Sequence, residues 1–395
     1  INAIQNTAFG YNTLYSCETC DGNTAIGYQA MKYQQGDYNI ALGHNAMSKH
    51  LDNGAVTSGS SNIAIGESAM RDGIGGTSNI AIGTGAMAES TSIGSYNIAI
   101  GGSALSLNTS GSSNIAFGTS ALYNNTTGSQ NIAFGSGALS LNKTGLNNVA
   151  IGRSALDGSE GDSNLVAIGA YALQFNKNGS YNTAIGYAAL NQNTTGEYNT
   201  AIGDSALYGM TIGEQNTAIG ASALSGLVGG NRNIGIGKGA GLNLSDGNDN
   251  IIIGVSAARG DGNTLESSDL IVIGSNALYK NDTGGASVVI GSGALYNSPS
   301  AFGEVVIGYE AAYNTNLTTS FSAKNMVAIG YQALYSQTSG SGNNAIGAQA
   351  LYSLQTGNNN TAFGRVALYS CTDCQRNVAI GGALYDLTSG QQNIG

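Results

Sequence analysis

The sequence predicts an all-β protein: a parallel β-solenoid, or β-roll, of about 22 coils with a 17-residue period. Three observations predict this fold. One motif recurs through the whole chain, the residues before its glycine alternate as in a strand, and 61 of the 395 residues are glycine while one is proline. Collagen needs glycine at every third position and abundant proline, so this composition excludes a collagen-like fibre.

The repeated motif is asparagine, a β-branched residue, alanine, isoleucine, glycine, two variable residues, and then alanine and leucine. Asn114–Leu122 and Asn182–Leu190 are two complete copies. The motif glycine occurs 22 times, and sixteen of the 21 intervals between successive motif glycines are 17 residues. We number positions within a coil from this glycine, so that the asparagine is −4 and the leucine is +4. Stacking such coils buries a continuous core that one coil alone cannot form.

Positions −3 to −1 predict a short strand, because a β-branched residue, a small residue and an isoleucine or phenylalanine alternate there. We expect the two large side chains to face the interior of the coil, together with the leucine at +4. The alanine at −2 would then lie on a flat outer face against which a neighbouring subunit packs closely. The alternation by itself also permits the opposite assignment.

A second short apolar segment follows the glycine, with alanine at +3 and leucine or methionine at +4. It predicts a coil of two short strands and two turns, closed by a loop of about eight polar residues. The glycine permits a bend with positive φ or the close approach of another segment of backbone. The asparagine at −4 suits a turn, and stacked asparagines would hydrogen-bond from coil to coil as a ladder.

Residues 1–395 form a single repeat array, with longer loops at 48–61, 258–269 and 313–325. The final Asn393–Gly395 match the opening of another copy, so we expect a fragment of a longer fibre. The core of such a short coil is narrow. This favours an intertwined or side-by-side homo-oligomer of closed symmetry, with a parallel trimer preferred.

The longer loops are candidate binding elements, because extra residues on one face of a solenoid often form its binding face. Neutral drift in exposed loops is the alternative interpretation. The polar, charged and aromatic residues that draw attention to these loops are Lys49, His50, Asp52, Phe321 and Lys324.

Charge and composition exclude several classes of function. The chain has 13 basic and 23 acidic residues, a net charge of −10, so it lacks the surplus of Lys and Arg that nucleic-acid phosphates require. No apolar run of about 18 residues predicts a membrane span. His44 and His50 are the only histidines and the carboxylates recur in no fixed pair, so we expect neither an enzyme nor a cofactor. Acidic loops at 157–162 and 246–250 lack an ordered set of calcium ligands, so we interpret them as solvated loops without a metal.

Two Cys-x-x-Cys pairs, Cys17 with Cys20 and Cys371 with Cys374, lie seven and ten residues after their motif glycines. The pairs are twenty coils apart, so their four sulfurs cannot form one zinc site within a chain. We expect structural disulfides, within a loop or between subunits, in an oxidising extracellular setting. A redox dithiol and a metal site shared between chains are the alternatives.

Tyrosine is the main aromatic residue, with 21 copies. It occupies position +5 in six consecutive coils, which predicts a stacked ladder, because equivalent positions of a solenoid lie above one another. The rings either seal one edge of the coil or face a ligand, such as a sugar or another protein. These residues are Tyr279, Tyr296, Tyr313, Tyr335, Tyr352 and Tyr369.

An ice-binding solenoid would need a regular array of exposed threonines. The recurring threonines, such as Thr183, Thr200 and Thr217, stand at −3, where isoleucine and valine also occur. We interpret this exchange as the sign of a buried position, which disfavours ice binding.

Copies such as Asn23–Ala30 (NTAIGYQA) and the loop Asn124–Gly128 (NNTTG) carry a family resemblance. The array resembles the head repeats of trimeric autotransporter adhesins of the YadA type, which form a left-handed parallel β-roll. It looks closer still to the repeats of bacterial and phage tail-fibre-like proteins. The resemblance covers almost the whole chain and implies a trimeric extracellular fibre used for attachment. The adhesin head repeat is shorter than this one, which leaves the organelle open.

We therefore expect a structural, non-catalytic fibre, an adhesin shaft or head, on a cell-surface appendage or a virion tail. Its partners would be identical chains, with a cell-surface glycan or protein as the attachment target. One alternative is a free-standing solenoid with an ice- or glycan-binding face. Another is a larger surface filament of higher symmetry, such as a grappling appendage.

Overall fold

The structure is a computed structural model that describes residues 4–48, 58–73, 75–89, 94–260, 265–315 and 325–395. It confirms the predicted all-β parallel solenoid with a 17-residue period. No helix among these residues is long and apolar enough to cross a membrane. The chain divides into two compact units, Ile1–Glu197 and Tyr198–Gly395, and both consist of the same kind of coil.

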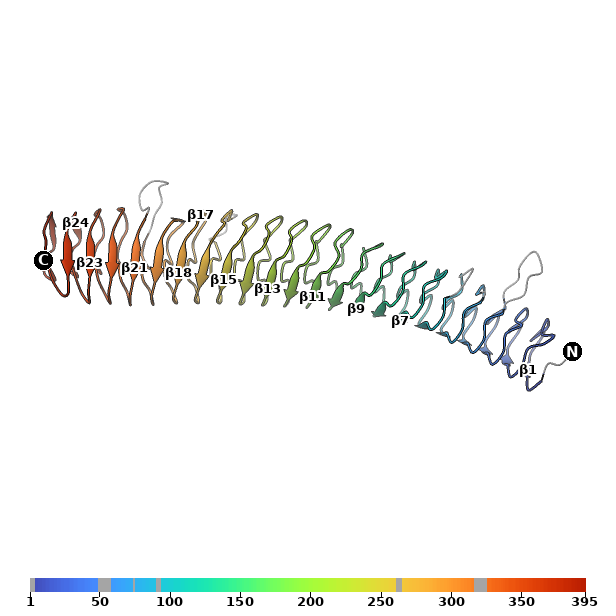
Figure 1. Ribbon diagram of the computed structural model, residues 1–395. Helices are drawn as coiled ribbons and strands as arrows, with labels where there is room; N and C mark the ends of the chain where they lie inside the picture. The colour runs from blue at the N-terminus through green and yellow to red at the C-terminus, as the bar shows by residue number, and fades with distance from the viewer. Residues whose placement is uncertain (1–3, 49–57, 74, 90–93, 261–264, 316–324) are drawn as a thin grey trace. The chain divides into compact units, whose positions relative to one another are not determined.

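The first unit contains one parallel sheet to which each coil contributes a three-residue strand (Figure 1). Each strand pairs with the strand of the next coil in chain order. The strands are β1 (Thr7–Phe9), β2 (Thr24–Ile26), β3 (Ile40–Leu42), β4 (Ile63–Ile65), β5 (Ile80–Ile82), β6 (Ile98–Ile100), β7 (Ile115–Phe117), β8 (Ile132–Phe134), β9 (Val149–Ile151), β10 (Val166–Ile168) and β11 (Thr183–Ile185).

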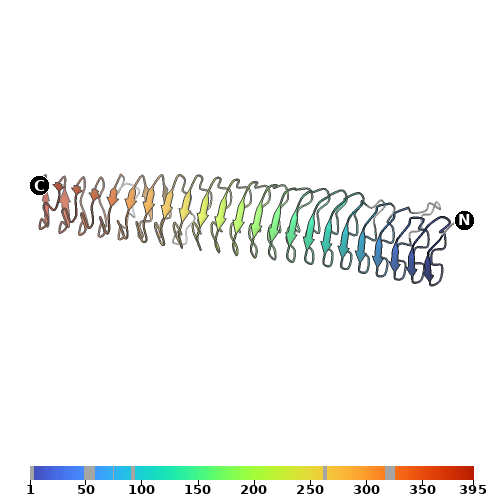
Figure 2. The ribbon, with the colours of Figure 1, turned by 60° about the horizontal axis from the view of Figure 1, so that its bottom comes forward.

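The second unit repeats this arrangement, and its strands also follow one another in chain order (Figure 2). The main sheet consists of β12 (Thr200–Ile202), β13 (Thr217–Ile219), β14 (Ile234–Ile236), β15 (Ile251–Ile253), β16 (Ile271–Ile273), β18 (Val288–Ile290), β20 (Val305–Ile307), β21 (Val327–Ile329), β22 (Asn344–Ile346), β23 (Thr361–Phe363) and β25 (Val378–Ile380). Two small parallel pairs lie in the loops: β17 (Thr283–Gly285) with β19 (Ser300–Phe302), and β24 (Asp373–Gln375) with β26 (Ser389–Gln391).

Strand pairing is in register, so equivalent residues of successive coils lie beside one another. Ile115 pairs with Ile132, and Phe117 pairs with Phe134. Because every pair follows this rule, each position of the coil becomes a row of side chains that runs from strand to strand.

The predicted orientation of the strands is wrong. The alanine at −2 faces the interior, and Ala116 and Ala133 have no exposed surface. The large residues at −3 and −1 face outward, and Phe117 and Phe134 are 43% and 52% exposed. The reason is space. Across a coil this short, the strand faces the alanine at +3 and the leucine at +4, and the gap admits a methyl group rather than two large side chains.

The second apolar segment is a turn, not the expected strand. Positions +2 and +4 adopt left-handed conformations, as at Ser120 (φ 56°) and Leu122 (φ 52°). This conformation costs a residue with a side chain roughly 1–2 kcal/mol. Hydrogen bonds between coils offset that cost, because the amides of Ser120 and Leu122 donate to the carbonyls of Gly102 and Ala138 at 2.9 and 3.0 Å. The turn therefore depends on the stack.

Small and large core residues compensate one another across coil boundaries. Gly235 replaces the alanine at −2, and a Cβ added there would lie 2.5 Å from Leu224 Cγ. Gly241 replaces the leucine at +4, and a Cβ added there would lie 3.1 Å from Ile252 Cδ1. The packing unit is thus a set of neighbouring coils, not a single coil.

The motif glycine is required both by backbone angle and by space, as the sequence predicts. At Gly118 φ is 134°, a region that residues with a side chain rarely adopt. A Cβ added to Gly118 would lie 2.6 Å from the carbonyl carbon and oxygen of Gly135 in the next coil. Alanine would therefore clash with the backbone, which cannot move aside without breaking the stack.

The predicted asparagine ladder is present and buried. Asn114 Nδ2 donates to Asn97 Oδ1 at 3.2 Å and to the Gly128 carbonyl at 2.9 Å. The Asn114 backbone amide also donates to Asn97 Oδ1, at 2.9 Å. Asn131 forms the same bonds with Asn114 in turn. Each side chain thus holds the coil before it and the coil after it.

Replacing Asn114 with alanine should destabilise the first unit by about 2 kcal/mol. The substitution removes the acceptor of the buried Asn131 backbone amide, and a buried polar group left unpaired costs about 1–3 kcal/mol, whereas the Gly128 carbonyl keeps its bond from Asn125 Nδ2. The matched control is Asn124→Ala in the loop, where a half-buried side chain loses one bond to the Ser140 carbonyl. Urea unfolding followed by circular dichroism measures both, and equal losses would contradict the role of the ladder.

Candidate binding surfaces

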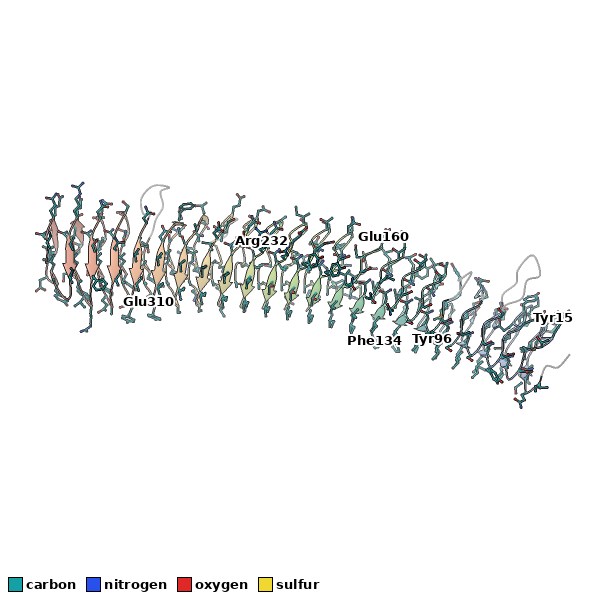
Figure 3. All side chains as sticks on the ribbon, in the orientation of Figure 1. Tyr15, Tyr96, Phe134, Glu160, Arg232 and Glu310 are labelled. Atoms are coloured by element: carbon teal, nitrogen blue, oxygen red, sulfur yellow. A yellow bond between two sulfur atoms is a disulfide. The ribbon has the colours of Figure 1, made fainter. Side chains whose placement is uncertain are left out.

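Both units present an outer sheet face without charge, formed by positions −3 and −1 of the main-sheet strands. These positions carry isoleucine, valine, leucine, phenylalanine or threonine in every strand, with Asn344 as the one exception. Phe117 and Phe134 stack on this face with ring centroids 4.7 Å apart. Figure 3 shows Phe134 and Tyr96 projecting from one side of the first unit, with Glu160 on the opposite, loop side.

The orientation of this face also corrects the interpretation of the threonines at −3. Thr183, Thr200 and Thr217 are half-buried on the outer sheet face. Their exchange with isoleucine and valine therefore does not mark a buried position, and that argument against an exposed threonine array is wrong.

Exposed tyrosines border the outer sheet face of the first unit. Position −5 precedes the buried asparagine and carries Tyr38, Tyr96 and Tyr181, which are 51–65% exposed. Position +1 follows the motif glycine and carries Tyr28 and Tyr187, which are also exposed. Tyrosine offers a large, rigid contact area with a polar tip, and it is enriched where proteins bind one another.

Positions +7 and +10 close the polar loop of the coil. In the first unit Asn108 Nδ2 donates to the Gly111 carbonyl at 2.8 Å. The pair Cys17–Cys20 takes the same two positions in another coil and is joined by a disulfide. In the second unit the pair Cys371–Cys374 is joined in the same way. Each disulfide thus links two positions of one loop within one chain.

The two disulfides should differ in their rate of reduction in the folded protein. Cys371 and Cys374 have no exposed surface, whereas Cys17 is half-buried, and an attacking thiolate needs access to sulfur. Brief treatment with a thiol reductant, followed by alkylation and mass spectrometry, should label Cys17 and Cys20 first. The same treatment in denaturant should label both pairs equally. Faster labelling of Cys371 and Cys374 in the folded protein would contradict the burial.

A buried carboxylate takes position +10 in one coil of the first unit. Asp162 is 7% exposed and accepts hydrogen bonds from Ser159 Oγ at 3.0 Å and Asn176 Nδ2 at 2.7 Å. Burial raises the pKa of the Asp162 carboxyl, the two hydrogen bonds oppose the rise, and the nearby Glu197 adds to it. The interpretation of 157–162 as a solvated loop is therefore wrong for Asp162.

The substitution Asp162→Asn should stabilise the first unit more at pH 7 than at pH 3. Because the folded pKa of Asp162 is raised, its contribution to stability is full below the ordinary carboxyl pKa and is lost as the pH rises through the folded value. The neutral amide avoids this loss. Asp249→Asn is the control of opposite sign, because Arg232 lowers the pKa of Asp249. Chemical unfolding between pH 3 and 7 tests both, and a pH-independent effect of Asp162→Asn would contradict the burial argument.

The tyrosines at +5 form the predicted stack in the second unit. From Tyr279 to Tyr369, neighbouring ring centroids are 4.9–5.6 Å apart and ring planes differ by 3–14°. Tyr385 extends the stack at 5.1 Å. Arg259 covers the other end, with its guanidinium 5.5 Å from the Tyr279 ring centroid and Nη1 2.7 Å from the Tyr279 hydroxyl.

The rings of this stack cover one another's faces, so a ligand beside it meets ring edges and hydroxyl groups. Burial and the nearby Glu310 carboxylate raise the pKa of Tyr335. Burial, Tyr296 and Glu310 raise the pKa of Tyr313. Both hydroxyls therefore stay protonated at neutral pH and can donate hydrogen bonds.

A polar groove of about 670 Å³ runs beside the tyrosine stack in the second unit. Sequence reasoning missed it, because its side chains come from five different coils. The described side chains that line it come from positions +6 and +8. The residues at +6 are Lys280, Asn297, Asn314 and Ser336, and those at +8 are Asp282, Pro299, Thr338 and Gln355.

The binding role proposed for the longer loops falls mostly on residues 49–57, 261–264 and 316–324, outside the described ranges; Lys49, His50, Asp52, Phe321 and Lys324 are among them. The other histidine, His44, stacks on Tyr28 at 5.3 Å, and its Nδ1 lies 3.8 Å from Glu67 Oε1. Within the described ranges, no three His, Cys, Asp or Glu side chains are grouped so that they could hold a metal ion.

Comparison with known proteins identifies no family. No protein-family model matches the chain, and no curated protein matches it. The surfaces that bear on function are therefore the outer sheet face, with its border of tyrosines, and the polar groove beside the tyrosine stack.

Proposed function

We propose that this chain is a structural, non-catalytic segment of an extracellular fibre that assembles from identical chains and serves in attachment to another cell or surface. The outer sheet face carries this proposal. In both units it lacks charge, its −1 row is apolar in every strand, and its −3 row carries isoleucine, valine or threonine except at Asn344. Soluble monomers rarely expose a long contiguous apolar surface, so a partner that covers this face is expected.

A second copy of the chain fits this face better than an unrelated partner does. Its rows repeat with every coil, so the face of a second copy has the same spacing. Because the face carries no charge, two copies bring no like charges together. The bordering tyrosines, such as Tyr96 and Tyr187, supply contacts of the type found at interface centres. The resemblance to adhesin heads and tail fibres favours three chains, and a larger surface filament of higher symmetry is the alternative.

The loop chemistry supports an extracellular location. Disulfides persist in oxidising compartments, and each Cys-x-x-Cys pair here is a loop-closing disulfide. Both stand where other coils use a hydrogen bond such as that from Asn108 to Gly111, which fits a structural role.

Light scattering of the purified chain should give the mass of three chains, both with and without reductant, because the disulfides lie within loops. A stable monomer under both conditions would overturn the proposed assembly. A larger closed ring would support assembly of identical chains and replace the trimer.

The double variant Phe117→Asp and Phe134→Asp should convert the oligomer to a monomer, because it places two carboxylates in an apolar interface. Leu141→Asp is the matched control, an equally exposed apolar residue (42%) in a loop outside the sheet face. Circular dichroism checks that the coil persists. Loss of the oligomer in the control, or its retention in the double variant, would place the interface elsewhere.

A further inference from the structure

We propose that the polar groove of the second unit binds an unbranched, neutral oligosaccharide. The groove crosses five consecutive coils, which at about 4.8 Å per strand gives a length of about 19 Å. Its volume of about 670 Å³ is in the range of ligand sites in proteins. An elongated groove of this size suits a chain-like ligand.

The lining offers the hydrogen-bonding groups that sugar hydroxyls need. Asn297, Asn314 and Gln355 have amides, which donate and accept, and Ser336 and Thr338 have hydroxyls. Among the described residues that line the groove, Pro299 is the one without a polar side chain. A polyhydroxylated ligand can pair with such a surface at every coil, whereas an apolar ligand would leave these groups without partners.

The amides are held in place by their neighbours. Asn297 Nδ2 donates to Asn314 Oδ1 at 3.4 Å, and the Asn314 side chain also forms a hydrogen bond with Tyr335. Thr338 Oγ1 donates to the Gln355 carbonyl at 2.9 Å, which leaves the oxygen lone pairs of Thr338 toward a ligand donor. Tyr335 of the tyrosine stack thus helps to position Asn314 in the groove.

Other ligand classes fit less well. A nucleic acid would need several cations, and Lys280 is the one basic residue among the described residues that line the groove. A peptide bound as an added strand of the main sheet would need an unpaired strand edge, whereas the main-sheet strands β18 and β20 of these coils pair on both sides. Lys280 and Asp282 stand at the same end and balance each other in charge, which favours a neutral ligand.

The corresponding positions of the first unit do not form such a lining. There, position +6 carries apolar residues in several coils, among them Leu107, Leu141 and Phe175. Leu141 and Phe175 are exposed. A run of polar residues at +6 in successive coils is therefore not a general property of the repeat.

The inference rests on the proposed function only in treating the oligosaccharide as an attachment target. The test uses the purified full chain on an array of linear hexasaccharides of glucose, mannose, galactose and N-acetylglucosamine in α and β linkage, together with acidic hexasaccharides. At least one neutral hexasaccharide should bind, and titration calorimetry then gives its affinity. Asn297→Ala with Asn314→Ala should lower that affinity at least tenfold.

Asn124→Ala is the matched control, since Asn124 occupies position +6 of a coil in the first unit and should leave the affinity unchanged. Thr338→Arg is a second variant that fills the groove from an exposed position and should also abolish binding. Binding to no hexasaccharide, a preference for acidic ones, or equal binding by the groove variants would overturn the proposal. Light scattering of the same samples separates the two hypotheses: an oligomer that binds no sugar contradicts the groove alone, and a monomer that binds sugar contradicts the assembly alone.

Discussion

One buried side-chain amide per coil holds most of the solenoid in register. The asparagine at −4 is buried, so both its donor and its acceptor must find partners in neighbouring coils. Asn114 does so through Asn97 before it and Asn131 after it. The need to keep these hydrogen bonds fixes the backbone at the turn before the strand. Extra residues can therefore be inserted only at other positions of the coil. The longer loop at 48–61 follows this rule, since β3 and β4 on either side remain in register.

Leucine replaces the asparagine of the ladder in some coils, and its backbone amide still forms the bond to the preceding coil. Leu165 and Leu270 take position −4 and are fully buried. Their backbone amides still donate to the preceding asparagines, Asn148 and Asn250, at 3.0 Å. Leucine has no side-chain donor or acceptor that needs a partner, and unlike alanine it fills the buried space with apolar surface. Stacking thus tolerates variation at a rung as long as the backbone bonds remain.

The period, the main-sheet strand before each glycine and the two kinds of ladder could be predicted from the sequence, because each follows from residue identity at a fixed spacing. The orientation of the strand could not be predicted, because an alternation of large and small side chains does not show which of the two sets faces the interior. The deciding factor at Ala116 is the width of the coil. That width is set by left-handed turns at Ser120 and Leu122, a conformation that such residues seldom adopt alone. The polar groove was missed for a related reason: each of its rows has the composition of a loop, and the groove exists only where five coils stack.

The orientation of the strand also decides which surface can serve which role. With alanine inside, the uniform rows of the coil face outward, and a uniform surface can match a copy of itself at every coil. The loop positions differ from the outer sheet face, because their residues vary from coil to coil. A change in the loop can therefore create a local binding site without altering the contact between two sheet faces. Positions +6 and +8 belong to the loop, so assembly through the outer sheet face leaves the polar groove accessible. A fibre built in this way would present the groove on every chain, and several weak sites on one assembly bind a repetitive surface more strongly than any single site does.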